Sequence, residues 1–141
     1  MKLKISRTEV WGATIDDRPG GLADKLAALA TAGANLGFII ARRMPEQRGS
    51  GVVFVTPIKG AKQIKAAEGA GFQNTESLHS VRVEGADKPG TGAKMTRALA
   101  KGGVNLRGLS AAAIGKRSVT YLAVDTAEDA AKVAGILRRL A

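Results

Sequence analysis

Hydrophobic and polar positions in the first half of the chain alternate between strand-like and helix-like spacing. Apolar residues occupy every second position of residues 9–15, which predicts a half-buried strand. In residues 22–30 leucine and alanine recur every three or four positions, which predicts a helix that ends at Gly33. Residues 35–42 and 51–57 are rich in branched apolar side chains and are joined by a loop-like segment, so they predict a β-hairpin.

The same order of elements continues along the chain and then repeats. Residues 61–70 have a helical composition and residues 72–78 predict a strand, which completes a β-α-β-β-α-β series. The elements expected afterwards are a strand at 80–85, a helix at 91–102, strands at 105–114 and 118–125, and a helix that opens with a capping box of Thr126 and Asp129. The second series lacks its last strand, and residues 2–6 alternate polar and apolar side chains, so we expect them to supply it.

An internal repeat underlies this order. A shift of 70 residues aligns Asp17-Arg18-Pro19-Gly20 with Asp87-Lys88-Pro89-Gly90, and Gly33-x-Asn35-Leu36 with Gly103-x-Asn105-Leu106. Ten of the twenty-two positions from 15 to 36 are identical in the second copy. A β-α-β-β-α-β series folds as a four-stranded antiparallel sheet with both helices on one face. We therefore predict an α+β protein of two tandem ferredoxin-like units, at 7–78 and 79–141, with residues 2–6 completing the second.

The turn between the first strand and the first helix carries the candidate chemistry. Pro19 fixes its own backbone angle, and the glycines after it leave the first helix amides unshielded. These amides have no partners within the helix and attract anionic groups such as carboxylates. Asp17 is placed either to cap the helix or to accept a hydrogen bond from a ligand's ammonium group. The glycines themselves serve either turn geometry or a ligand.

The asparagine that follows each first helix is a second candidate. Asn35 lies at the far end of its helix from Asp17, so within one unit the two side chains are not expected to meet. Asn35 either contacts a ligand at the turn of a neighbouring unit or is a turn residue that tolerates left-handed backbone angles.

The two copies of the Asp-x-Pro-Gly turn and the Gly-x-Asn-Leu segment resemble the ACT domain. The resemblance covers nearly the whole chain as two copies, and it implies the same β-α-β-β-α-β fold, with amino acids bound between paired domains to regulate enzymes or transcription. Serine-binding members hold their ligand through a polar residue of the turn and the asparagine of Gly-x-Asn. The ligand-binding residues expected here are Asp17, Arg18, Gly20, Gly21, Leu22 and Asn35, and in the second copy Asp87, Gly90, Gly92 and Asn105. This chain differs from the commoner pattern at Asp17, at Ile15, where some members have histidine, and at Gly92, where leucine is usual.

Composition limits the other functions. The net charge of +10 makes RNA a candidate partner. The charge is divided equally between the two halves, however, and the few aromatic residues form no RNA-recognition motif. With no cysteine and one histidine, His79, the chain lacks the residues of most metal and nucleophilic sites, so we expect neither a cofactor nor catalysis. No apolar run approaches the roughly 20 residues of a membrane span, and the start does not resemble a signal peptide, so a cytoplasmic location is expected.

The sequence therefore predicts a non-catalytic regulatory protein that binds a small amino acid at an interface of ACT-like units. A homodimer is expected, with an enzyme or a transcription factor as the regulated partner. The alternatives are an RNA-binding module and a protein-interaction module without a ligand.

Overall fold

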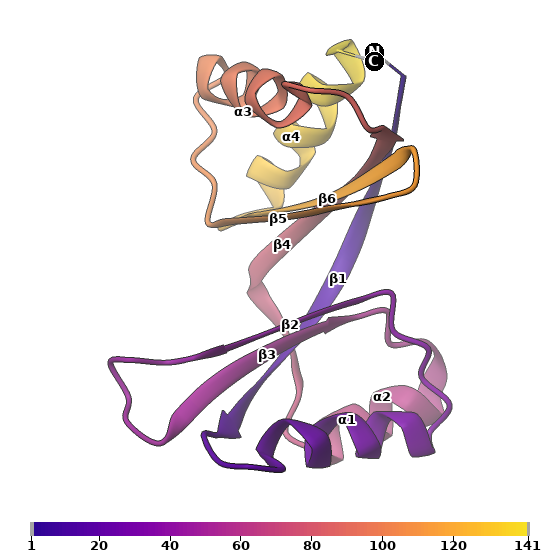
Figure 1. The fold of residues 1–141 in the computed structure, drawn as a ribbon, viewed down its shortest axis with the longest axis vertical. Coiled ribbons are helices and arrows are strands. Elements are labelled where there is room, and N and C mark those ends of the chain that lie inside the picture. The colour runs from indigo at the N-terminus through magenta and orange to yellow at the C-terminus, as the bar shows by residue number, and fades with distance from the viewer. Residues whose placement is uncertain (1, 141) are drawn as a thin grey trace. The chain divides into compact units, whose positions relative to one another are not determined.

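The computed structural model describes residues 2–140, and for residues 75–78 it describes the backbone alone. The protein is an α+β fold, as predicted (Figure 1). Its elements are β1 (Leu3–Asp16), α1 (Gly21–Thr31), β2 (Phe38–Arg43), β3 (Ser50–Thr56), α2 (Gly60–Gly69), β4 (Gln73–Ala86), α3 (Thr91–Lys101), β5 (Gly108–Ile114), β6 (Arg117–Val124) and α4 (Ala127–Leu140).

The chain divides into two compact units. The first unit is Glu9–Thr75, and the second unit combines Met1–Thr8 with Glu76–Ala141. Each of β1 and β4 contributes residues to both units, whereas the sequence predicts two separate strands in each place. The reason is local: no glycine or proline stands between the predicted strands, so nothing in the sequence turns the chain there.

The first unit has a sheet covered on one face by α1 and α2 (Figure 1). The second half of β1 pairs antiparallel with β3, which pairs antiparallel with β2. Alternate strand residues point toward the helices, as the period of two requires. The buried core consists of Trp11, Ala13, Leu29, Val53, Val55, Ala67 and Phe72. The order of elements found here is the one predicted from the hydrophobic pattern.

The second unit repeats this plan with α3 and α4 on one face of its sheet (Figure 1). β4 pairs antiparallel with β6, which pairs antiparallel with β5, and β1 lies on the other side of β4. Leu3 and Ile5 pack against the core of this unit. A Cβ atom added at Gly85 would lie 2.9 Å from Leu3 Cδ2, so the N-terminal segment runs closely along β4. This is the edge at which the sequence led us to expect residues 2–6.

At the start of α4, one of the two hydrogen bonds of the predicted capping box is present. The Asp129 amide donates a hydrogen bond of 3.0 Å to Thr126 Oγ1, which satisfies one of the amides that a helix start leaves without an internal partner. The buried face of α4 follows the helical spacing of the sequence and consists of Ala130, Val133, Ala134 and Leu137.

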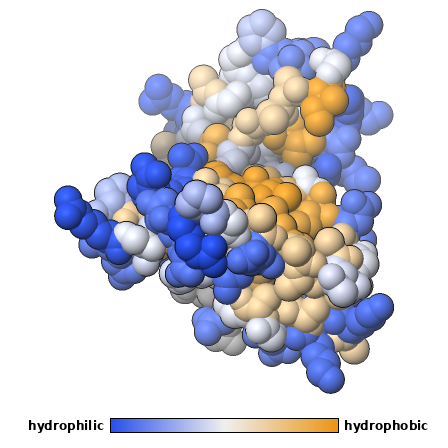
Figure 2. Space-filling view, turned by 60° about the horizontal axis from the view of Figure 1, so that its bottom comes forward, coloured by the Kyte–Doolittle hydropathy of each residue, from blue (hydrophilic) through white to orange (hydrophobic). Residues whose placement is uncertain are grey.

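Some large hydrophobic side chains remain at the surface. Figure 2 shows a face on which hydrophobic side chains gather among hydrophilic ones. In the described part of the chain, the large hydrophobic residues with exposed side chains are Ile39, Ile64, Leu109 and Ile114. Such positions are common on protein surfaces and by themselves identify no site. Among the described helices none is both long and apolar enough to cross a membrane.

Candidate functional site

The first corner, residues 16–22, is the turn that leads from β1 into α1. Gly20 has a φ of 87°, a left-handed angle that glycine adopts without steric cost. The Arg18 amide donates to the Asp16 carbonyl at 2.9 Å, and the Gly21 amide donates to the Arg18 carbonyl at 3.1 Å. The chain therefore reverses within a few residues and starts the helix directly beside the end of the strand.

Gly21 is required for close packing at this corner. A Cβ atom at this position would lie 2.1 Å from the Asp16 carbonyl oxygen, closer than any real contact. Only glycine lets α1 begin so near the end of β1. The turn geometry therefore requires glycine at both Gly20 and Gly21.

The next amides of α1 remain open. The Asp24 amide makes the first helical hydrogen bond, to the Gly20 carbonyl at 2.9 Å. Within the described residues the Leu22 and Ala23 amides have no acceptor, and no side chain caps this helix. Asp17 is therefore not the helix cap, which was one of its two possible roles. Two unpartnered amides and the positive end of the helix dipole make this point favourable for an anion.

Asp17 is held in place by a cation from the neighbouring hairpin. Its carboxylate accepts hydrogen bonds from Arg43 Nε at 2.6 Å and from the second guanidinium nitrogen at 3.4 Å. The Asp17 amide donates to the Gly49 carbonyl at 2.9 Å. Arg43 did not emerge from the sequence as a site residue. The strand register could have found it, because β3 pairs Gly51 with both Ile15 and Arg43.

Arg18, next to Asp17 in the chain, has partners of its own. It approaches the carboxylates of Asp24 at 3.2 Å and Asp16 at 3.5 Å, and donates to the Pro19 carbonyl at 3.1 Å. Its side chain is about half exposed, so these contacts stabilise the fold only weakly. Each charge of this corner is therefore balanced by an opposite charge nearby.

A hollow of about 390 Å³ opens at the first corner. It is lined by Ile15, Asp16, Asp17, Arg18, Leu22, Ala41, Arg42, Arg43 and Gly51. The lining therefore combines two aspartates and three arginines with the apolar residues Ile15, Leu22 and Ala41. A lining with both signs of charge is complementary to a zwitterion.

Asn35 does not reach this hollow within its own unit. It is exposed in the segment between α1 and β2. The register places Phe38 opposite Thr56 at one end of β2 and Arg43 opposite Gly51 at the other. Five residue steps of a strand span about 17 Å, so Asn35 lies at the opposite end of the sheet from Asp17. The sequence predicted this separation.

The second corner, residues 86–92, has the same backbone plan. Gly90 has a φ of 82°, and the Asp87 amide donates to the Lys116 carbonyl at 2.8 Å. Thr91 occupies the place of Gly21, and its hydroxyl donates to the Lys88 carbonyl at 2.9 Å. At Gly92 a Cβ atom would have no neighbour within 4 Å, so this glycine leaves open space where the first corner has Leu22.

The charges of the second corner differ from those of the first. In the repeat, Ala86 replaces Asp16, Lys94 replaces Asp24, and Ala113 replaces Arg43. Asp87 consequently has no cation paired with it among the described residues. Asn105 is exposed before β5, at the end of the sheet away from Asp87. The backbone geometry is repeated, whereas the charge pattern is not.

Neither corner offers a metal site. In the part of the chain that the structure describes, no three histidine, cysteine or acidic side chains are grouped to hold an ion. His79 lies in β4 opposite Val124, as an ordinary strand residue.

Comparisons with known proteins give the fold a context. No family model matches the chain, and no curated protein matches it by sequence. Among solved structures, the ligand-free regulatory subunit of aspartate kinase from Thermus thermophilus matches with a TM-score of 0.67 and 21% identity, over 99% of this chain and 96% of that one.

Two further structures agree with this match. Protein BT0572 from Bacteroides thetaiotaomicron gives a TM-score of 0.77 at 16% identity, over 98% of this chain and 90% of that one. The regulatory subunit of aspartate kinase from Thermus flavus gives 0.61 at 20% identity, over 98% and 94%. The resemblance to ACT domains that the repeated motifs predicted is therefore confirmed at the level of structure: the chain has the tandem ACT fold of aspartate kinase regulatory subunits.

Proposed function

We propose that this protein is a non-catalytic regulatory protein that binds a small amino acid at the first corner. The observation that carries the proposal is a hollow lined by both aspartate and arginine residues and by Leu22, at the start of α1, where two helix amides have no acceptor among the described residues. An amino acid carries one negative and one positive group a few bonds apart. It can therefore satisfy both kinds of group at once.

The roles of the residues follow from their charges. The ligand carboxylate binds the Leu22 and Ala23 amides, where the helix start favours an anion. The ligand ammonium group binds Asp17. Arg43 holds one oxygen of that carboxylate closely and the other loosely, and a carboxylate has about four acceptor positions, so capacity remains for a second donor.

Assembly completes the site. Because Asn35 lies at the far end of its own sheet, an asparagine that contacts the ligand comes from another unit, and a homodimer is the simplest assembly to provide it. The regulated partner is an enzyme or a transcription factor. The fold shared with aspartate kinase regulatory subunits favours an enzyme.

We assign the amino acid to the first corner rather than the second. Asp87, Gly90, Gly92 and Asn105 form the equivalent set, and Asp87 offers a carboxylate. The loss of two other carboxylates leaves this corner predominantly cationic, however, which disfavours a ligand that carries an ammonium group.

The test is a thermal-shift panel of the twenty amino acids, followed by isothermal titration of any that stabilise the protein. We expect binding to weaken by about tenfold or more in Asp17→Asn, because a hydrogen bond between two charged groups is lost. The matched variant Asp87→Asn removes the same charge from the other corner and is expected to retain wild-type affinity. The proposal is wrong if no amino acid stabilises the wild-type protein, or if both variants lose affinity equally.

A further inference from the structure

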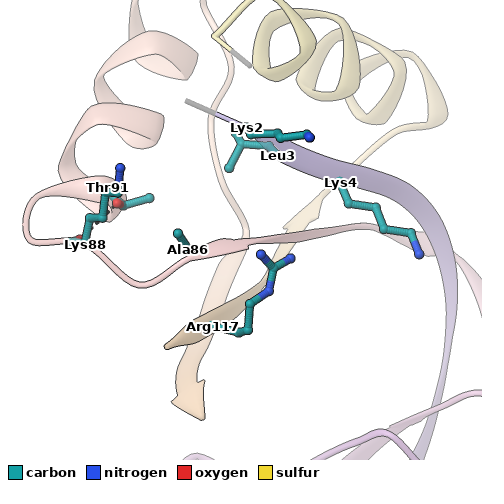
Figure 3. Close-up of a pocket in the computed structure, with 7 residues that line it drawn as sticks. All are labelled: Lys2, Leu3, Lys4, Ala86, Lys88, Thr91 and Arg117. Carbon is teal, nitrogen blue, oxygen red and sulfur yellow. Dashed lines mark hydrogen bonds between the residues drawn. The ribbon is translucent and has the colours of Figure 1, made fainter. Parts of the chain in front are cut away.

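The second unit contains a hollow whose lining differs in charge from that of the hollow at the first corner. Its volume is about 440 Å³. It is lined by Lys2, Leu3, Lys4, Ala86, Lys88, Thr91 and Arg117 (Figure 3). Four of these seven side chains are cationic and none is acidic. The cations come from three places in the chain: the start of β1, the loop before α3, and the start of β6.

Figure 3 shows how these groups are arranged. The guanidinium group of Arg117 points from β6 toward the segment that carries Lys2 and Leu3. Lys88 and Thr91 lie across the hollow, in the loop before α3 and at its first residue. The lining thus includes cationic side chains from three parts of the chain, and all of them belong to one compact unit.

The protein does little to neutralise these charges. Across residues 2–140, neither Lys2, Lys4 nor Lys88 has an ion-pair partner. Arg117 approaches Glu84 at 3.5 Å, but that carboxylate already accepts a shorter hydrogen bond, of 3.0 Å, from Arg82. Among the described residues, Glu84 is therefore the carboxylate within ion-pair distance of these four cations, and Arg82 holds it more closely; Asp87, next to Lys88 in the chain, forms no ion pair with them.

The internal repeat shows that this excess is local to one copy. In the first corner Arg18 is flanked by Asp16 and Asp24, which both approach its guanidinium group. The corresponding neighbours of Lys88 are Ala86 and Lys94. Two acidic positions have become neutral and basic around a retained cation, on a backbone of the same shape.

Like charges gathered around a hollow repel one another, and an anion between them relieves that repulsion. An amino acid zwitterion would bring a further positive charge. A phosphate group carries close to two negative charges and three strong acceptor oxygens, and the planar guanidinium fork matches its geometry. We propose that this hollow binds a small molecule carrying a phosphate or diphosphate group. The proposal is independent of amino acid binding at the first corner.

The test is isothermal titration of the full chain with pyrophosphate and with glycerol phosphate, and citrate and glutamate serve as anions without phosphorus. We expect saturable binding of at least one phosphate compound, weakened by added salt, and clearly tighter than citrate or glutamate. In the double variant Lys88→Gln/Arg117→Gln the affinity is expected to fall by about tenfold or more. The control Lys101→Gln/Arg139→Gln removes the same charge from exposed helix positions and is expected to change affinity much less.

Several outcomes would overturn the proposal. One is the absence of saturable binding of either phosphate compound. Another is an equal loss of affinity in the control variant, which would indicate general attraction by a basic protein. Citrate that binds as tightly as pyrophosphate would exclude recognition of phosphate, and tight binding of single-stranded RNA without binding of pyrophosphate would identify a macromolecular ligand instead. Asp17→Asn separates the two proposals, because it is expected to leave pyrophosphate binding unchanged.

Discussion

Replacing Gly21 by alanine tests how the first corner is built. The new Cβ atom would lie 2.1 Å from the Asp16 carbonyl oxygen, whereas carbon and oxygen normally approach to about 3.3 Å. The start of α1 must therefore move away from β1 by about 1 Å. Overpacking of this kind costs about 3 kcal/mol at the upper end of its usual range, and the better helix propensity of alanine returns about 1 kcal/mol. We expect a net loss of about 2 kcal/mol in the free energy of unfolding.

The assay follows from the composition. The chain has a single tryptophan, Trp11, which is buried in the first unit, so its fluorescence during urea denaturation reports the unfolding of that unit. The control is Gly69→Ala, at the end of α2 in the same unit as Trp11, where a Cβ atom meets nothing within 4 Å. That variant is expected to retain or slightly gain stability. A wild-type urea midpoint for Gly21→Ala would refute the argument that this glycine is required by close packing.

Two other predictions concern the second unit. Leu3→Ala is expected to lower the free energy of unfolding by about 1 to 2 kcal/mol, because Leu3 is partly buried against the core of this unit. The control is Lys4→Ala, since Lys4 is exposed on the same strand. Equal melting temperatures for the two variants would contradict the packing of Leu3. The pKa of Glu84 lies below its ordinary value of 4.5, mainly because its carboxylate accepts a hydrogen bond from Arg82. The pair of Arg82 and Glu84 therefore stabilises the folded protein above pH 4.5, and this stabilisation is lost as the pH falls through the lowered pKa. The difference in melting temperature between wild type and Glu84→Gln should therefore shrink on acidification, and a difference that grows would be inconsistent with the ion pair.

The order of elements could be predicted because each buried face follows its own period. Alternation predicted β1 and spacing of three and four predicted α1, and the repeat made the same assignment possible twice. The length of β1 and β4 could not be predicted in this way. A strand that continues from one unit into another has no local signal, since the pattern of alternation is the same whether the partner strand changes or not.

The site was predictable only where it depends on the local chain. Gly20 and Gly21 stand out in the sequence because the turn itself needs them. Arg43 and the N-terminal lysines do not stand out in the sequence. Strand pairing brings Arg43 to the first corner and the lysines to the second corner from distant parts of the chain. Such groupings depend on register, and register becomes visible only when the sheet is assembled.

The comparison of the two corners separates what the backbone determines from what the side chains determine. Gly20 and Gly90 have nearly the same left-handed φ, 87° and 82°. In each corner the aspartate amide donates a hydrogen bond to a carbonyl of the neighbouring hairpin. The two turns therefore present their helix starts in the same way, and backbone geometry cannot distinguish their ligands. The acidic and basic positions exchanged around the turns can distinguish the ligands, because electrostatic attraction in a partly enclosed hollow depends on the sum of the nearby charges. The two proposals therefore depend on the side chains around a repeated backbone, and not on the backbone itself.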